Sequence, residues 1–412
     1  MKQFLPYKVM DLEVSQPLAD VTGLEEYELL VCVLWFHGYP VGFAKLRVRN
    51  GNVEAAALER AIRNHKGRIA EHRALLVRGK SDISEWPAVT VAVCTRDRPN
   101  DLRLCLVALG ELDYPDTDVI VVDNAPTSDA TECIVRQVLP GARYVREPKP
   151  GLDWARNRAI AESRGEIVAF TDDDVIVDRG WLRALVQPLL EDPAVMAVTG
   201  LVVPFELDTH AQTLFEAYGG FSRGFKKRRH GALRRSKRIA ARYGNTGSFG
   251  TGANMAFRRA LFDRIGSFDP ALDVGTVTNG GGDLEMFFRV LKEGYALVYE
   301  PGALVRHRHR RTYPELREQI TNWGTGMYSY VVRSVLAYPE ERPAFVLLAG
   351  RLFFTWYVWR FLKSYLRPLF PRELILDEMR GALIGLRRYH TARENAGRIA
   401  RSFDSLSPGA ST

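Results

Sequence analysis

The chain has 412 residues, which is long enough for two or three structural units. Hydrophobic residues make up 46% of it and charged residues 26%, a balance that is typical of globular proteins and excludes general disorder. The formal net charge of +8 favours an anionic ligand or surface. The four cysteines are scattered and form no C-x-x-C pair, which argues against a disulfide framework or a structural zinc site and favours a reducing cytoplasm.

Residues 1–86 are predicted to form an N-terminal accessory module. Two β-rich runs, 27–35 and 41–48, are separated by His-Gly-Tyr-Pro, which predicts a hairpin or a short meander. A helical pattern follows over 53–73, and a polar linker at 79–85 ends the module. The module contains no catalytic pattern, so an accessory or oligomerisation role is the expectation.

From residue 88 onward, apolar strands alternate with helical patterns. The predicted strands are 89–94, 118–122, 144–146 and 167–171, and the predicted helices are 101–111, 127–138, 152–163 and 179–190. Because the strands are almost continuously apolar, the alternation predicts an α/β fold whose mostly parallel sheet is covered on both faces. Such sheets bind ligands at the carboxyl ends of their strands, so we expect the chemistry in the loops that follow.

Three consecutive carboxylates follow the fourth predicted strand, in the segment Thr171-Asp172-Asp173-Asp174. Adjacent carboxylates disfavour one another's ionised form, so a folded protein keeps them at a strand end with a compensating cation. Mg²⁺ and Mn²⁺ prefer hard oxygen ligands of this kind. A solvated acidic turn is the alternative, and the position at the carboxyl end of a buried strand favours the metal site.

Two further positions are candidates for nucleotide binding. Asp123 ends the second predicted strand, where a carboxylate could accept hydrogen bonds from a base or a ribose; a turn or N-cap aspartate is the alternative. Gly151 opens a predicted helix whose free N–H groups suit a phosphate, with Arg156 as a direct partner.

Together, these segments resemble the inverting family 2 glycosyltransferases with a GT-A fold. The resemblance covers roughly residues 88–312 and implies a Rossmann-like catalytic domain over 87–312. The matching segments are Val91-Ala-Val-Cys-Thr95-Arg-Asp-Arg-Pro99, Val-Val-Asp123-Asn124, Gly151-Leu-Asp-Trp-Ala-Arg156-Asn157, Thr171-Asp-Asp-Asp174, Gly252-Ala-Asn254-Met-Ala-Phe-Arg-Arg259, Gly280-Gly-Gly-Asp283-Leu-Glu285-Met-Phe-Phe-Arg289 and Val305-Arg-His307-Arg-His309-Arg310.

The resemblance implies a donor site for a nucleotide-diphosphate sugar with Mn²⁺ or Mg²⁺. Asp172 and Asp174 match the outer acids of a D-x-D motif, the first near ribose and metal and the second on the ion that bridges the diphosphate. His307 matches a histidine that completes the metal or diphosphate site in some members. Thr95 and Asp123 would line the nucleoside pocket, and Arg156 would approach the base or the phosphate.

The resemblance also assigns a general base. Asp283 lies at the position of the carboxylate that takes the proton from the attacking acceptor hydroxyl. The family's usual Glu-Asp pair reads Gly282-Asp283 here, so Glu285 is the alternative base and a further candidate for substrate binding. Asn254 and Asp173 are expected to contact the donor sugar or the acceptor.

Single-sugar transfer is favoured over polymerisation. Processive members carry a Q-x-x-R-W motif and several membrane-spanning helices, whereas this chain reads Gln319-Ile-Thr-Asn322-Trp323. The acceptor is expected to be a saccharide or a lipid-linked glycan.

Two segments suggest an anionic membrane surface as a partner. Residues 223–242 carry ten Lys or Arg; this run is either a solvated loop or a contact for an anionic acceptor or headgroups. Residues 345–369 lie in a C-terminal helical region, 313–395, and mix aromatic with basic side chains. They fit a helix in the membrane interface, peripheral on the inner face of the cell membrane, and equally a helix packed on the catalytic domain or on a second subunit of a homo-oligomer. A flexible tail is expected over 396–412.

Two other functions compete with glycosyl transfer. A sugar nucleotidyltransferase would carry an early Gly-rich phosphate loop, and residues 93–99 contain no glycine. A non-catalytic nucleic-acid-binding protein would interleave aromatic residues with its basic run, and none does so here. No nucleic-acid partner is therefore expected.

Overall fold

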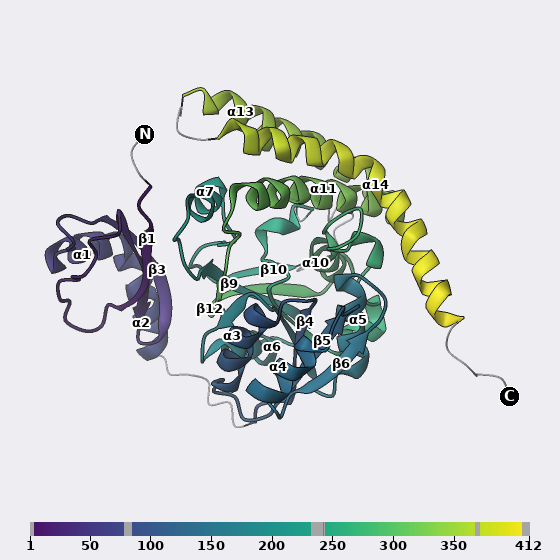
Figure 1. The fold of residues 1–412 in the computed structure, drawn as a ribbon, viewed down its shortest axis with the longest axis horizontal. Coiled ribbons are helices and arrows are strands. Elements are labelled where there is room, and N and C mark those ends of the chain that lie inside the picture. Colours follow the sequence, from purple (N-terminus) through teal and green to yellow (C-terminus); the bar gives the residue numbers. More distant parts are fainter. Residues whose placement is uncertain (1–3, 78–84, 232–241, 243, 367–370, 406–412) are drawn as a thin grey trace.

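The structure, a computed structural model, describes residues 4–77, 85–231, 242, 244–366 and 371–405. It contains a small N-terminal sheet, a large central sheet with helices on both faces, and a layer of long C-terminal helices (Figure 1).

The N-terminal module is a three-stranded sheet with two helices. Its elements are β1 (Tyr7–Glu13), β2 (Leu29–Phe36), β3 (Tyr39–Arg47), α1 (Ala55–Ile62) and α2 (Lys66–Val77). The predicted hairpin of β2 and β3 and the helical pattern after it are confirmed, and the polar linker at 79–85 lies largely outside the described residues. Strand β1 was not predicted, and none of its side chains is fully buried.

Strand β2 joins this module to the rest of the chain. Leu30, Cys32 and Leu34 face the module's own core, whereas Val33 and Trp35 pack against the central sheet. This division follows from the two-residue period of a strand, which sends successive side chains to opposite faces. The module is therefore docked through a buried apolar interface.

The central sheet has nine strands in the order β10-β12-β9-β11-β7-β4-β5-β6, with β8 paired to β12. The strands are β4 (Val89–Thr95), β5 (Thr117–Asn124), β6 (Arg143–Glu147), β7 (Ile167–Asp172), β8 (Val175–Val177), β9 (Val195–Pro204), β10 (Arg228–Gly231), β11 (Asn254–Arg258) and β12 (Ala296–His307). Strand β4 runs parallel to β5 and β7, and β9 runs parallel to β12. The predicted α/β class with a mostly parallel sheet is confirmed.

Helices cover both faces of this sheet. The helices are α3 (Pro99–Gly110), α4 (Ala130–Val138), α5 (Leu152–Glu162), α6 (Trp181–Glu191), α7 (His210–Tyr218), α9 (Ala260–Ile265) and α10 (Gly282–Lys292). Val91 and Val93 of β4 pack in one core with α3 and α6, and Ala92 and Cys94 pack in the other with α5 and α10. Every side chain of β4 is buried, which explains its continuous apolar sequence.

The C-terminal region forms a helical layer above the sheet in Figure 1. It consists of α11 (Tyr313–Ala337), α12 (Arg342–Leu352), the π-helix η5 (Phe353–Val358), α13 (Trp359–Ser364) and α14 (Arg372–Asp404). Glycines let α11 and α14 approach closely: a Cβ at Gly381 would lie 2.0 Å from the carbonyl oxygen of Thr321. A flexible tail was predicted from residue 396, but α14 continues to Asp404. The polar side chains of this last part are compatible with a helix that is exposed to solvent.

The basic run at 223–242 is in part an edge strand. Arg228 and Arg229 belong to β10, which pairs with β12, and Arg229 forms an ion pair with Asp192 at 3.0 Å. Lys227 pairs with Glu191 and Glu300. Residues 228–231 therefore form a strand and not a loop, while residues 226–229 are exposed to solvent as predicted; residues 232–241 lie outside the described residues.

Candidate active site

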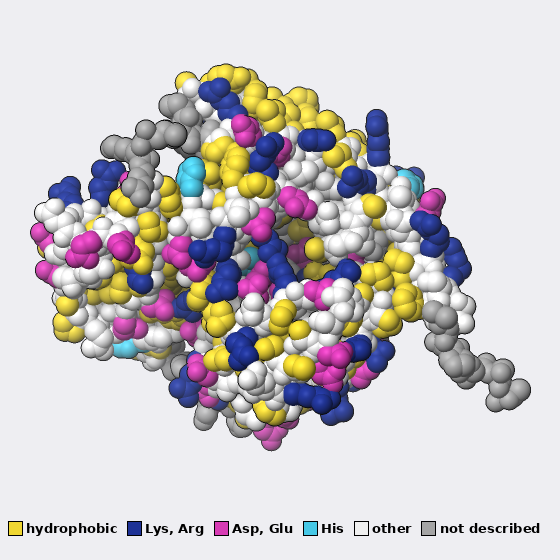
Figure 2. Space-filling view, in the orientation of Figure 1, with side chains coloured by type: hydrophobic (Ala, Val, Ile, Leu, Met, Phe, Trp, Pro, Cys, Tyr) yellow, Lys and Arg dark blue, Asp and Glu magenta, His cyan; other side chains and the backbone are white. Residues whose placement is uncertain are grey.

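A cavity of about 660 Å³ opens at the carboxyl ends of the central strands. Acidic and basic side chains surround the hollow near the centre of Figure 2. One wall comes from the strand ends and the loops after them: Thr95, Arg98, Asn124, Asp172, Asp173, Asp174, His307 and Arg310. The opposite wall comes from α11: Glu315, Glu318, Gln319, Asn322 and Trp323.

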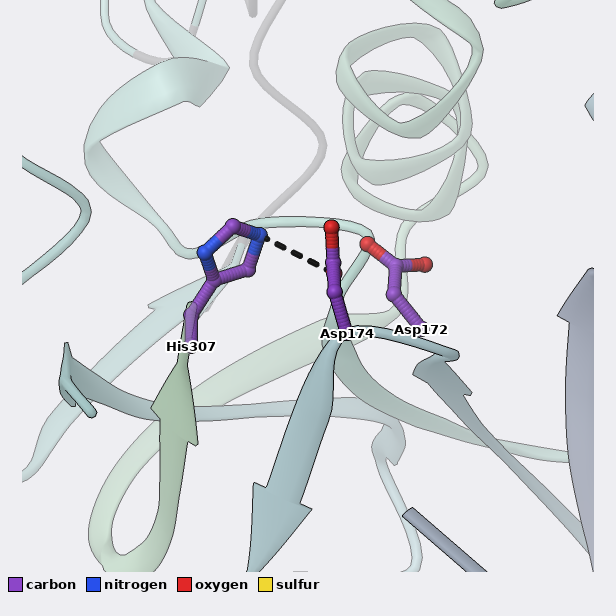
Figure 3. Close-up of side chains that lie close together, drawn as sticks. All are labelled: Asp172, Asp174 and His307. Carbon is purple, nitrogen blue, oxygen red and sulfur yellow. Dashed lines mark ion pairs between the residues drawn. The ribbon is translucent and has the colours of Figure 1, made fainter. Parts of the chain in front are cut away.

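Asp172, Asp174 and His307 form a cluster that could hold a metal ion. One ligand atom from each lies within 4.8 Å of the others, and the three side chains converge in Figure 3. Asp172 ends β7 and Asp174 follows it, while His307 ends β12 and is paired with Val175 of β8. The pairing of β8 with β12 thus brings together side chains that are more than 130 residues apart in sequence. The predicted grouping is confirmed.

The charge states of this cluster suit a divalent cation. Burial and the neighbouring Asp174 raise the pKa of Asp172 to about 6, although Arg156 opposes the shift. Burial acts in the same direction on Asp174, but His307, Arg98 and Arg310 outweigh it and lower the pKa of that carboxyl. Burial lowers the pKa of His307 to about 4 despite the Asp174 carboxylate. Near neutral pH the cluster therefore offers two carboxylates and an uncharged imidazole, the ligand types that bind divalent metals.

A chain of contacts from His307 through His309 to Glu216 fixes the orientation of His307. Its Nδ1 lies 3.2 Å from Nδ1 of His309, and Nε2 of His309 lies 2.9 Å from a carboxylate oxygen of Glu216 on α7. If Nε2–H of His309 donates to Glu216, its Nδ1 accepts from Nδ1–H of His307. Nε2 of His307 then keeps its lone pair and faces Asp174 at 3.2 Å. Sequence reasoning missed Glu216, because nothing in α7 marks its proximity to His309.

Replacing Glu216 by Gln is expected to weaken Mn²⁺ binding about 10- to 100-fold, because an amide can donate to His309 and favour the wrong tautomer of His307. Mn²⁺ affinity measured by electron paramagnetic resonance would test this. Glu59→Gln, an exposed change in the accessory module, is the control. Equal affinities in both variants would contradict the role of Glu216.

Asp173 points to protein partners and not to the metal cluster. Its carboxylate accepts a hydrogen bond from the Thr95 hydroxyl at 2.6 Å and from the Arg98 guanidinium at 2.9 Å. Arg98 also reaches Asp174 at 3.1 Å. Asp173 also lines the cavity, so its predicted contact with substrate stays a prediction, while its oxygens position Thr95 and Arg98. Arg98 and Arg310, which sequence reasoning left without a role, are the cations nearest the metal cluster on the cavity wall.

Asp123 lies behind the cavity wall with one acceptor free. It is fully buried, and Oδ2 accepts a hydrogen bond from the Tyr144 hydroxyl at 2.8 Å. Among the described residues, no donor reaches Oδ1, and burial raises the pKa of this carboxyl. The next residue, Asn124, lines the cavity. Asp123 does not line the cavity, and the Thr131 hydroxyl also acts on its carboxyl, so its contact with a base or a ribose stays a prediction.

Arg156 lies beneath the cavity and not on its wall. Only 6% of it is exposed, and its Nη1 forms an ion pair with Asp153 at 3.0 Å. The charges of Asp153, Asp172 and Asp283 all act on it. The prediction that Arg156 contacts base or phosphate is corrected: in this structure it is a buried cation among carboxylates.

Asp283 begins α10 and is partly exposed. Its two oxygens accept backbone N–H bonds from Gly252 and Leu284, each at 2.8 Å. Asp283 is near enough to Asp172 for its charge to contribute to the raised pKa of that residue. Asp283 is not among the residues that line the cavity.

Glu285 and Asn254 do not face the cavity. Glu285 is fully buried and forms ion pairs with Arg289 and, at 2.7 Å, with Arg333. The amide of Asn254 is also fully buried; it donates to the carbonyl oxygens of Leu201 and Ala303. The predictions that Glu285 and Asn254 bind substrate are therefore wrong, because both side chains are buried and bonded to other parts of the protein.

Comparisons with known proteins find similarity to glycosyltransferases. Residues 90–266 match glycosyl transferase family 2. The chain is similar to the probable glycosyltransferase YdaM of Bacillus subtilis (strain 168), with 26% identity over 309 residues that cover 72% of this chain and 69% of YdaM. It is 28% identical over 274 residues to the pre-mycofactocin glycosyltransferase of Mycobacterium tuberculosis (H37Rv), covering 64% of this chain and only 51% of that protein.

Two solved structures align with the chain at low identity. The mannosyltransferase PcManGT from Pyrobaculum calidifontis, in complex with GDP-Man and Mn²⁺, aligns over 82% of each chain with 18% identity and a TM-score of 0.43. Glucosyl-3-phosphoglycerate synthase from Mycobacterium tuberculosis aligns over 60% of this chain and 78% of its own, with 21% identity and a TM-score of 0.39.

Proposed function

We propose that this chain, whose residues 90–266 match glycosyl transferase family 2, moves a single sugar from a nucleotide diphosphate to an acceptor hydroxyl, with inversion at the anomeric carbon. The observation that carries the proposal is the convergence of Asp172, Asp174 and His307 at the carboxyl ends of the strands. A divalent cation held there, Mn²⁺ or Mg²⁺, would supply positive charge to the diphosphate as it leaves. Arg98 and Arg310 add charge on the same side of the cavity.

The remaining chemistry falls to Asp283. In-line displacement needs a base on the acceptor side that removes the hydroxyl proton during attack. Asp283 is partly exposed, its carboxylate is oriented by two backbone N–H groups, and it lies in electrostatic reach of Asp172. Glu285, the alternative base, is committed to Arg289 and Arg333. Asp283 is therefore the residue to which we assign proton removal.

The α11 wall is the proposed acceptor side. Glu318, Gln319, Asn322 and Trp323 line it, and Oε1 of Gln319 has no hydrogen-bond partner among the described residues. Carboxylates and amides together with one aromatic ring suit the hydroxyl groups and apolar faces of a neutral saccharide. The negative charge of Glu315 and Glu318 disfavours an anionic group at this wall.

The direct test is an assay of sugar transfer from UDP-, GDP- and dTDP-sugars, with and without Mn²⁺ or Mg²⁺. The release of the nucleoside diphosphate measures the reaction. A rise in melting temperature with one nucleotide diphosphate would identify the base in advance. The anomeric configuration of the product, read by proton NMR, tests inversion. Release of pyrophosphate in place of a nucleoside diphosphate would favour the nucleotidyltransferase alternative and contradict the proposal.

We further propose that the protein works in the cytoplasm as a peripheral protein on an anionic membrane. Within the described chain, one helical stretch, Pro339–Ser364, is long and apolar enough to cross a membrane by length and composition, and only 11% of its most apolar window is buried. Hydrophobic side chains gather over this region in Figure 2. The exposed apolar side chains include Leu347, Phe354, Trp359, Leu362 and Leu366. Arg351 and Lys363 are exposed beside them, the combination expected of an interfacial helix.

Sedimentation with vesicles tests this membrane proposal. The wild-type chain is expected to bind phosphatidylglycerol vesicles more strongly than phosphatidylcholine vesicles. A Phe354→Ser/Trp359→Ser variant should lose most of this binding, whereas Val107→Ser, which removes an equally exposed apolar side chain on α3, should retain it. A homo-oligomer that dissociates in the first variant, with no vesicle binding by the wild type, would show that a second subunit covers this surface instead.

A further inference from the structure

Gly282 is a glycine for reasons of space and not of backbone conformation. In the glycosyltransferase family that this chain resembles, the usual residue at this position is Glu. Gly282 begins α10 without the positive φ of its neighbours Gly280 (139°) and Gly281 (107°), so any residue could adopt its backbone conformation. A Cβ at this position would, however, lie 1.9 Å from Oδ2 of Asp153. The carboxylate of α5 therefore occupies the space that a side chain at 282 would need.

Asp153 is placed among charged groups of the site. Only 1% of it is exposed, its Oδ1 accepts a hydrogen bond from Arg156 at 3.0 Å, and its Oδ2 has no hydrogen-bond partner among the described residues. Its backbone N–H donates to Asp273, which fixes the first turn of α5. Burial raises the pKa of Asp153 to about 7, and the pairing with Arg156 opposes this shift.

The negative charges of Asp172 and Asp283 also stabilise the Arg156 cation. A guanidinium that paired with Asp283 would hold the lone pairs needed for proton removal. In the structure Asp283 accepts hydrogen bonds from the backbone N–H groups of Gly252 and Leu284, and Arg156 pairs with Asp153. The ion pair within α5 thus keeps the buried cation beside the base without tying it to the base.

Resting on the proposed function, we propose that Asp153 is a positioning residue that holds Arg156 away from Asp283. Its carboxylate takes the space that a side chain at position 282 would need. Asp153 and Gly282 are therefore a coupled pair: a carboxylate at 153 requires glycine at 282.

The test is a double-mutant comparison of kcat, donor KM and melting temperature. Asp153→Asn keeps the size of the side chain and is expected to lower kcat about 10- to 100-fold, with donor KM changed less than about threefold. Gly282→Glu alone should be at least as impaired, since its side chain meets Asp153. The double variant Asp153→Ala/Gly282→Glu should recover at least about tenfold of the lost kcat.

A variant pair with smaller changes covers the case in which Gly282→Glu does not fold. Gly282→Ala should lower the melting temperature in the wild-type background and much less in the Asp153→Ala background. An unchanged kcat in Asp153→Asn, or no recovery in the double variant, would overturn the proposal. Absence of sugar transfer by the wild-type chain would instead overturn the proposed function, and the melting temperatures would still report whether positions 153 and 282 are coupled.

Discussion

Asp283→Asn is expected to lower kcat by about 10²- to 10⁴-fold while leaving donor KM nearly unchanged. The change keeps the size of the side chain but removes the group that takes the acceptor proton. The amide can still accept one of the two backbone N–H bonds, from Gly252 or Leu284, so the start of α10 should remain folded. Initial rates with saturating metal, together with the melting temperature, measure both effects.

Glu285→Gln is the matched comparison for this prediction, since it changes the alternative base two residues away. It removes the negative charge that Arg289 and Arg333 share in the core, so it should lower the melting temperature markedly. The fraction that stays folded should keep its kcat. A loss of kcat in Glu285→Gln at an unchanged melting temperature, with an active Asp283→Asn, would reverse the assignment of the base.

Asp174→Asn is expected to reduce kcat/KM by about 10³-fold and to weaken Mn²⁺ binding. Asp174 is the carboxyl of the cluster whose pKa is lowered, and it lies at 3.2 Å from His307, 3.1 Å from Arg98 and 3.8 Å from Arg310, so its charge organises three groups at once. The neighbouring change Asp173→Asn is the control, because Asp173 is bound to Thr95 and Arg98 and does not belong to the metal cluster. Equal losses in the two variants would show that the acidic segment acts as a whole and not through Asp174.

The sequence predicted the catalytic half of the sheet well, because β4, β5 and β7 are buried on both faces and read as continuous apolar runs. It did not predict β11, which lies antiparallel between β7 and β9. A local sequence pattern does not indicate which strands a segment will pair with. The position of β11 between β7 and β9 is therefore determined by tertiary contacts. The same limit applies to β8, three residues whose pairing with β12 brings His307 to Asp174.

The position of Asp172 and Asp174 could be predicted because ligands bind at the carboxyl ends of parallel strands, whereas His307 was expected only from the family resemblance. The failures have local physical causes. Glu285 lies two residues after Asp283, which on a helix turns its side chain to the opposite face, toward the core. Asn254 binds the carbonyl oxygen of Ala303, which lies within the register shift between β12 and β9. A polar side chain that satisfies a bulge cannot be told from a ligand by sequence alone.

The central claim is that Asp172, Asp174 and His307 hold the divalent ion to which the nucleotide diphosphate binds. Electron paramagnetic resonance of Mn²⁺ titrated into the protein, with and without UDP or GDP, tests it most directly. We expect one bound Mn²⁺ per chain whose affinity rises with the correct nucleotide and falls in Asp174→Asn and His307→Ala. Binding of Mn²⁺ and nucleotide that is unaffected by both substitutions would contradict the claim.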